Sequence, residues 1–277
     1  MNLPEPMPAL SGRRVLLAYG LAGEAIARLS VVGFDYMGTQ LAWLRACGAK
    51  AEVVALPTAA AVEDNATLLA KALTAEAEPC LLLSHSKGGL ESLSALLRPG
   101  VAAHCAAFLA LQSPFYGSPV ADALLHSPGF HGAARRLAQL LRVGSGAGLV
   151  DLTSAVRTAW MEERAAQIAA LTSLLPVLCV ASQVKRDTAV GPDRRYLPLA
   201  EWLERRGAGA NDGLVPVASA LLPGARHWVL NASHRALVSS GEGRDPVGVL
   251  RQALEAMLAA STALPASGQG EGTLPSA

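Results

Sequence analysis

The sequence contains little of what several classes of protein require. Only 4% of its 277 residues are aromatic and 16% are charged, with 23 basic and 22 acidic side chains. Because the formal net charge is only +1, no strong field gathers phosphate, and we expect no nucleic-acid partner. No apolar run reaches the roughly 20 residues that a membrane-spanning helix needs, so we expect a soluble globular protein without an integral membrane segment.

Cysteine is scarce as well, and its spacing argues against a disulfide framework. Cys47, Cys80, Cys105 and Cys179 lie far apart, and none forms a CxxC pair. Three of them lie in or beside apolar runs, which favours small buried thiols over disulfides or a metal site. The N-terminus, MNLPEPMPALSGRR, has acid and proline where a signal peptide would have a basic head and an apolar core. We therefore expect a cytoplasmic location.

Six short apolar runs alternate with longer helical patterns. The runs are continuous rather than alternating, which is typical of strands covered on both faces of a parallel sheet. They span residues 15–19, 51–56, 80–83, 106–111, 177–181 and 227–230. Helical patterns lie at residues 37–47, 65–73 and 246–260. The alternation predicts an α/β fold with a mostly parallel, doubly wound sheet.

One connection is several times longer than the others, with some 65 residues between the strands predicted to end near Leu111 and to begin near Val177. Two helical patterns, at residues 133–141 and 154–174, flank a glycine-rich segment there. In a doubly wound fold such an insertion would lie over the carboxyl edge of the sheet, where these folds hold their sites.

The chain is therefore expected to divide into three parts. We predict an α/β core at residues 12–112 and 176–261, with a helical cap or lid at residues 113–175. The tail at residues 262–277 lacks apolar periodicity, and we expect it to be disordered.

The segment LLLSHSKGGL, residues 81–90, joins an apolar run directly to a helical pattern. A nucleophile elbow has this arrangement: its serine stands on a strained turn at the strand tip, and small residues two positions away let strand and helix approach. Here the elbow reads Ser84-x-Ser86-x-Gly88, with Ser84 in place of the first glycine of the strict motif. Ser86 is the candidate nucleophile, and a serine-rich turn without activity is the alternative.

A serine nucleophile needs a base, and the sequence offers six histidines. His234 follows the last apolar run, in a loop that leaves the same sheet edge as Ser86, so it is the candidate base. His85 lies on the elbow, where packing is expected. His104 precedes a predicted strand and His227 opens one, both at the wrong end of the strand, while His126 and His131 lie in the insertion.

Two aspartates are candidates for the acid that orients the base. Asp212 lies in a nearly uncharged, glycine-flanked turn, where a buried carboxylate needs a specific partner. Asp187 lies beside Lys185 and Arg186, which suggests a solvated loop. The chemistry favours Asp212 and leaves Asp187 open.

Five segments, in order, resemble those of bacterial α/β-hydrolase lipases and esterases of the true-lipase type. The family segments look like V-x-x-V-H-G-L, G-H-S-x-G-G-L, T-P-H-x-G-S-x-x-A-D and N-D-G-L-V-x-x-x-S, followed by a histidine after the last strand. Their counterparts here are LLAYGL (16–21), SHSKGGL (84–90), SPFYGSPVAD (113–122), NDGLVPVAS (211–219) and His234. The resemblance spans residues 14 to 238 and implies an α/β-hydrolase fold with a helical cap.

The resemblance implies a serine carboxylic-ester hydrolase, an esterase or lipase, with Ser86, Asp212 and His234 as its catalytic triad. It also implies an oxyanion hole formed by the backbone N–H groups of Leu21 and Lys87. Two such donors stabilise the tetrahedral oxyanion, and loss of one typically costs about 10²–10³ in rate.

The sequence departs from the family pattern at two histidines. Tyr19 stands before Gly20, and Phe115 stands after Pro114, where the family has histidine. Either change could alter substrate choice without removing the oxyanion hole, because backbone N–H groups form it. Some members of the family hold calcium, but no carboxylate cluster here has a convincing ligand pattern, so we expect no metal and no cofactor.

The pocket decides which acyl compound such a triad takes, so an acyltransferase, a thioesterase, an amidase and a catalytically silent binding protein stay open. We expect a small-molecule ester with an apolar acyl or alcohol part, and a homo-oligomer is compatible with the sequence. The side chains expected either to line the acyl pocket or simply to attach the cap to the core are Leu124, Leu125, Leu137, Leu140, Leu141 and Trp160.

Overall fold

The computed structural model describes residues 4–19, 36–57, 59–126, 147–241 and 243–262. Within them, six parallel strands form one sheet in the order β2-β1-β3-β4-β5-β6. The strands are β1 (Arg14–Ala18), β2 (Lys50–Val53), β3 (Cys80–His85), β4 (Cys105–Leu111), β5 (Val177–Gln183) and β6 (Arg226–Asn231). Each predicted apolar run is a strand, which confirms the parallel α/β sheet.

The central strands are apolar on both faces because both faces are covered. Successive side chains of a strand point to opposite sides of the sheet. In β1, Leu16 belongs to the core cluster on one side, whereas Val15 and Leu17 belong to the cluster on the other. In β3, Leu82 and Leu83 are divided in the same way. An unbroken apolar run, rather than an alternating one, is the consequence.

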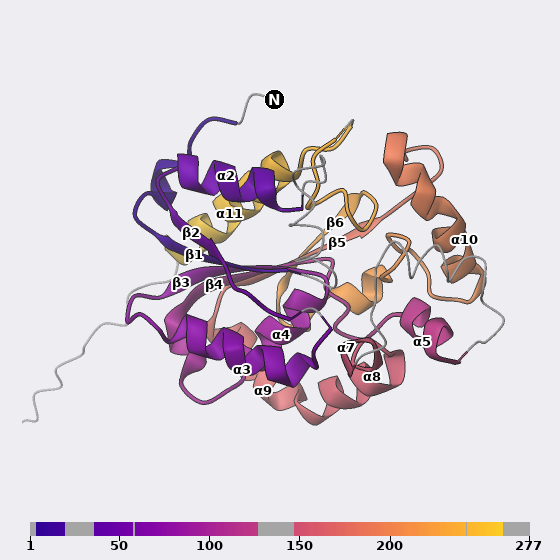
Figure 1. The fold of residues 1–277 in the computed structure, drawn as a ribbon, viewed down its shortest axis with the longest axis horizontal. Coiled ribbons are helices and arrows are strands. Elements are labelled where there is room, and N and C mark those ends of the chain that lie inside the picture. The colour runs from indigo at the N-terminus through magenta and orange to yellow at the C-terminus, as the bar shows by residue number, and fades with distance from the viewer. Residues whose placement is uncertain (1–3, 20–35, 58, 127–146, 242, 263–277) are drawn as a thin grey trace, which may run out of the picture.

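Helices form a layer on each face of the sheet (Figure 1). One layer holds α2 (Gly38–Ala46) and α11 (Pro246–Thr262), whose side chains share a core cluster with one face of the strands. The opposite layer holds α3 (Val62–Leu73), α4 (Lys87–Leu96), α8 (Ser154–Glu163) and α9 (Ala165–Leu174). This arrangement confirms the doubly wound prediction.

Further short elements surround the carboxyl edge of the sheet. They are α5 (Pro119–His126), α7 (Ala147–Val150), η4 (Gly191–Tyr196), α10 (Leu197–Arg205) and η5 (Val217–Ala220), while η1 (Pro8–Leu10) and η3 (Val101–His104) lie elsewhere. The sequence analysis did not identify α10. This helix contributes Ala200 and Leu203 to a third core cluster, which also contains Tyr196 of η4.

The long connection after β4 does not form a single unit. Its second helical pattern, expected at residues 154–174, breaks at Arg164 into α8 and α9. Ile168 and Leu171 of α9 pack into the core under the sheet, whereas α5 and α7 lie toward the carboxyl edge. The pattern at residues 133–141 and the tail at residues 263–277 lie outside the described residues. The division into core, cap and tail stays a prediction.

The four cysteines are free and buried, as the sequence indicates. Burial raises the pKa of the Cys80 thiol to about 11 and that of the Cys179 thiol to about 12, which makes both unreactive at neutral pH. No helix in the described part of the chain combines the length and apolarity needed to cross a bilayer.

The strand order creates a place for a site. From β1 the chain moves outward to β2 and then returns to the other side of β1 with β3. The segments that follow β1 and β3 therefore diverge, and doubly wound folds bind ligands in the crevice at such a switch point. Tyr19 follows β1 there, and Ser86 follows β3.

Candidate active site

Ser86 occupies a strained turn between β3 and α4. Its backbone has φ 55° and ψ −127°, a conformation that L-residues rarely adopt and that costs roughly 1–3 kcal/mol. The surrounding structure enforces it: Ser86 N donates to Leu111 O at 2.9 Å, and Gly89 N donates to Ser86 O at 3.0 Å. The turn leaves Ser86 half-buried, while Lys87 and Gly88 beyond it are buried.

The small residues around Ser86 let β1 and α4 approach closely. A Cβ atom on Gly88 would lie 2.4 Å from Ala18 O and 2.7 Å from Tyr19 O. Ser84, which replaces the usual glycine, is buried, and its hydroxyl lies 2.5 Å from that of Ser92. Ser92 in turn donates to Gly88 O at 2.7 Å. The serine at position 84 therefore has a partner on α4 and fits the elbow.

The structure brings Ser86, His234 and Asp212 into one hydrogen-bonded chain. His234 Nε2 lies 3.0 Å from Ser86 Oγ, and His234 Nδ1 lies 2.8 Å from Asp212 Oδ2. Both partners of the serine are buried, with exposed fractions of 5% for His234 and 1% for Asp212. Because the carboxylate can only accept, Nδ1 carries the proton, and Nε2 is left to accept from the serine hydroxyl.

The turn around Asp212 holds its carboxylate in place. Asp212 Oδ1 accepts from Leu214 N at 2.9 Å and from Val215 N at 2.8 Å. His234 N donates to Asp212 O at 3.0 Å, so acid and base are also joined through the backbone. The other acid candidate, Asp187, is exposed. The structure thus decides between the two aspartates in favour of Asp212 as the partner of His234.

His85 is buried beneath His234 and uses both ring nitrogens. Its Nε2 donates to His234 O at 3.0 Å and contacts Gln112 Oε1 at 3.2 Å, while its Nδ1 lies 2.5 Å from Tyr36 Oη. Burial, with a further contribution from nearby His234, holds the pKa of His85 well below its usual value. His85 is therefore a neutral ring that supports the backbone of His234 and does not contact Ser86 in the hydrogen-bonded chain.

Two of the remaining histidines lie at the amino ends of strands, as the sequence analysis predicts. His104 Nδ1 contacts Glu76 O at 3.0 Å just before β4, and His227 Nε2 donates to Leu222 O at 2.7 Å near the start of β6. His126 ends α5, and His131 lies outside the described residues.

Gln112 is a site residue that the sequence analysis missed. It has φ 49° directly after β4, and its Nε2 donates to Ser233 O at 2.9 Å and to Ser182 Oγ. A polar residue directly after a buried strand, at the same sheet edge as Ser86, is the signal that points to it. Its amide fixes the residue that precedes His234.

The side chain of Lys87 points away from Ser86. Its ammonium forms a buried ion pair with Glu91, and Glu91 Oε1 also accepts from Asn65 Nδ2 at 2.7 Å. Burial raises the pKa of the Glu91 carboxyl despite these partners. Only the backbone of Lys87 is then left for the site, and as the first residue of α4 its N–H has no acceptor within the helix.

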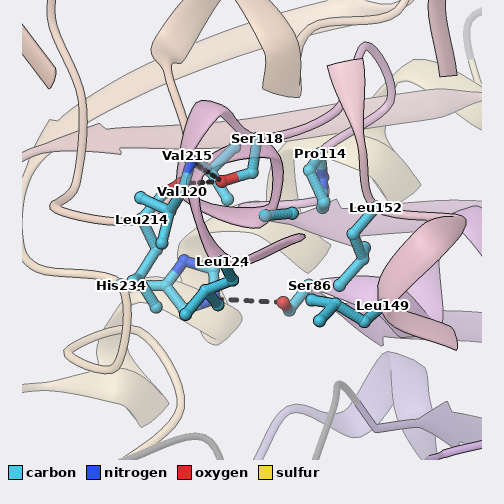
Figure 2. Close-up of a pocket in the computed structure, with 11 residues that line it drawn as sticks. Ser86, Pro114, Ser118, Val120, Leu124, Leu149, Leu152, Leu214, Val215 and His234 are labelled. Carbon is cyan, nitrogen blue, oxygen red and sulfur yellow. Dashed lines mark hydrogen bonds between the residues drawn. The ribbon is translucent and has the colours of Figure 1, made fainter. Parts of the chain in front are cut away.

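An apolar pocket opens beside Ser86 and His234, and Figure 2 shows the two at one side of it. Its other lining residues come from the segment after β4, α5, α7 and the Asp212 turn: Pro114, Ser118, Val120, Ala121, Leu124, Leu149, Leu152, Leu214 and Val215. The pocket therefore places the Ser86 hydroxyl and the His234 imidazole opposite a mostly hydrocarbon wall.

The prediction of which side chains line the acyl pocket is only partly correct. Leu124 lines the pocket, but its neighbour Leu125 is 42% exposed, because consecutive residues on a helix point about 100° apart. Trp160 packs against the core under the sheet, and its Nε1 donates to Glu63 Oε1 at 3.3 Å. Leu137, Leu140 and Leu141 lie outside the described residues. The Asp212 turn, which was not expected there, supplies part of the wall.

Comparison with solved structures identifies the architecture. The mature form of lipase BlEst2 from Bacillus licheniformis matches with a TM-score of 0.64 and 21% identity, over 84% of this chain and 89% of that one. A metagenomic carboxyl esterase matches with a TM-score of 0.67 and 22% identity, over 94% of this chain and 77% of that one. The chain has an α/β-hydrolase fold.

A third α/β-hydrolase match extends over nearly the whole length of both chains. Staphylococcus hyicus lipase has a TM-score of 0.58 at 11% identity, with 95% of this chain and 98% of that one covered. No protein-family model and no curated protein matches the sequence.

Two further expectations concern the oxyanion hole and a metal ion. Leu21, the other expected oxyanion donor, lies outside the described residues. Among the residues that the structure describes, no group of three or more His, Cys, Asp or Glu side chains could hold a metal ion.

Proposed function

We propose that this protein is a serine hydrolase that cleaves carboxylic esters through an acyl-enzyme. The observation that carries the proposal is the chain Asp212–His234–Ser86, at 2.8 and 3.0 Å, beside an apolar pocket. The strained backbone of Ser86 supports it, because such strain persists where function uses it.

The geometry suits acyl transfer to water. Ser86 Oγ attacks the ester carbonyl while His234 Nε2 takes the hydroxyl proton, and Asp212 stabilises the imidazolium that forms. His234 then gives this proton to the leaving alcohol as the tetrahedral intermediate collapses to the acyl-enzyme. A water molecule attacks the acyl-enzyme with His234 as base, and the acid and free Ser86 are released.

We assign the oxyanion hole to the backbone N–H groups of Lys87 and Leu21. Lys87 N–H directly follows the nucleophile and begins α4, so the positive end of the helix dipole adds to its effect. The assignment of Leu21 rests on the resemblance of its segment to the true-lipase turn.

The substrate that fits is a small ester with an apolar acyl or alcohol part. The pocket beside Ser86 is walled mainly by leucine and valine side chains. Burial of each methylene of such a chain contributes about 0.8 kcal/mol to binding.

Hydrolysis of p-nitrophenyl esters from C2 to C16 tests the proposal. We expect turnover by the wild type and by Ser173→Ala, which changes an exposed serine on α9, and loss of it in Ser86→Ala. Equal rates in the wild type and Ser86→Ala would contradict the proposal. Thioesters and amides of the best acyl group then show which leaving group the site prefers.

A further inference from the structure

Beside the three-residue chain lies a buried ion pair to which the proposed mechanism gives no part. Asp193 in η4 and Arg244, which precedes α11, have side chains that are only 7% and 8% exposed. Arg244 Nε donates to Asp193 Oδ1 at 2.9 Å, and Arg244 Nη2 donates to the same oxygen. Both residues lie far from Ser86 in the sequence, and neither lines the pocket.

The ion pair contacts the residue directly before the candidate base. Ser233 is completely buried, and its hydroxyl donates to Asp193 Oδ1 at 2.7 Å. Three donor groups therefore converge on one carboxylate oxygen. We propose that the Asp193–Arg244 pair positions His234 for reaction with Ser86, acting through the hydroxyl of Ser233. This inference rests on the proposed function of Ser86 and His234.

The hydrogen bonds of residues 233 and 234 support a positioning role. Ser233 O accepts from Gln112 Nε2 at 2.9 Å, and His234 O accepts from His85 Nε2 at 3.0 Å. His234 N donates to Asp212 O at 3.0 Å. These bonds fix the peptide groups on either side of His234, and the Ser233–Asp193 bond adds a tether from the side chain of Ser233 itself. Without it, the turn keeps these backbone bonds but loses its link to the Asp193–Arg244 pair.

The pair also joins the base loop to the segment that supports the acid. Asp193 lies three residues before Tyr196, and a Cβ atom on Gly213 would lie 2.7 Å from Tyr196 Cβ. The Asp212 turn thus packs tightly on the segment that carries Asp193. Arg244 is fixed in turn by its N–H bond to Gly241 O at 3.1 Å. Acid and base therefore share one support.

Stability alone is a weak explanation for the pair. Removing two charges from water costs about as much as their attraction returns, so a buried ion pair adds little over an apolar pair of similar volume. A carboxylate that accepts three directed bonds does specify where its donors lie. Displacement of a catalytic group by about 1 Å can lower a rate about 10²-fold.

The sharpest variant is Ser233→Ala, which removes the tether and leaves the ion pair intact. We expect kcat to fall about tenfold with KM within twofold of the wild type, because the substrate pocket is unchanged while the base is misplaced. Asp193→Asn, which also leaves Arg244 without its charge partner, should lower kcat about 10²-fold. Arg186→Met is the control, because it removes an Arg–Glu pair whose arginine is exposed and has no bond to the turn that carries His234 among those the structure gives, and it should retain the wild-type kcat.

Proton NMR gives a readout that does not depend on turnover. The Nδ1 proton between His234 and Asp212 should give a low-field resonance in the wild type and in Arg186→Met, and it should broaden or shift in Ser233→Ala. A folded Ser233→Ala with the wild-type kcat and an unchanged resonance would overturn the positioning role. Absence of ester turnover in the wild type would instead count against the proposed function, and the resonance would still decide the positioning role.

Discussion

His85 Nε2 donates a hydrogen bond to His234 O at 3.0 Å, so the residue before the candidate nucleophile supports the backbone of the candidate base. On the other side of the ring, Tyr36 Oη lies 2.5 Å from His85 Nδ1. Since Nε2 is the donor, Nδ1 accepts the tyrosine hydrogen, and this pattern requires the neutral ring. Protonation of His85 would make Nδ1 a donor, so the Tyr36 hydroxyl would have to turn its own hydrogen away and accept instead.

This arrangement predicts how stability depends on pH. Burial holds the pKa of His85 well below the value of about 6.5 that the unfolded chain has, so below pH 6.5 the unfolded state binds more protons. The free energy of unfolding should then decrease as the pH falls below about 6.5, by up to about 1.4 kcal/mol per pH unit. Urea unfolding between pH 7.5 and 5 measures this dependence of the free energy of unfolding on pH. His85→Gln should have a shallower dependence, and an equally steep one would contradict the assignment.

The role of Asp212 predicts a large effect on rate. Asp212→Asn leaves the shape of the site but no longer enforces the proton on Nδ1, so we expect kcat for p-nitrophenyl esters to fall by about 10⁴. Asp187→Asn is the matched control, because Asp187 is exposed, and it should retain the wild-type rate. Equal losses in both variants would rule out Asp212 as the acid.

The close approach of β1 to α4 predicts that position 88 tolerates no side chain. Gly88→Ala would place Cβ 2.4 Å from Ala18 O, and a backbone atom cannot move aside easily. We expect a loss of about 3 kcal/mol or more in the free energy of unfolding, measured by urea denaturation. Gly207→Ala, at φ 79° with nothing within 4 Å of the added Cβ, should cost only about 1 kcal/mol. Similar costs for the two variants would contradict the steric account.

The pocket predicts which residue of α5 sets the acyl chain length. Leu124→Phe should narrow the pocket and move the optimum of the p-nitrophenyl ester series to shorter chains, with a raised KM for the longer ones. Leu125→Phe is a control on the same helix, because Leu125 is 42% exposed and does not line the pocket. The same shift in both variants would show that α5 acts through its stability rather than through the pocket wall.

Local patterns in the sequence were enough to predict the sheet and to single out Ser86 and His234. The runs at β1 and β3 are apolar because both faces are covered, Ser86 directly follows β3, and His234 lies in the loop just after β6. Those features depend on residues adjacent in the chain. Asp212 is different: the chemistry of its turn favoured it over Asp187 without excluding the latter, and the contact with His234 supports Asp212.

Features that depend on tertiary contacts could not be predicted in the same way. The short helix α10 and the Asp193–Arg244 pair have no local signature, because their partners come from distant segments. The pocket wall was only partly predicted, since apolar spacing does not tell which of Leu124 and Leu125 faces the site. The sequence alone also does not show that Ser84 fits the elbow in place of glycine, because the fit depends on its hydrogen bond with Ser92 of α4.

Covalent labelling of Ser86 tests the central claim most directly. A fluorophosphonate reacts with a serine that a neighbouring base activates, and peptide mapping by mass spectrometry identifies the modified residue. The account predicts one adduct, on Ser86, formed rapidly by the wild type and much more slowly by Asp212→Asn. A folded wild-type protein that remains unlabelled, or that carries the adduct on another residue, would contradict it.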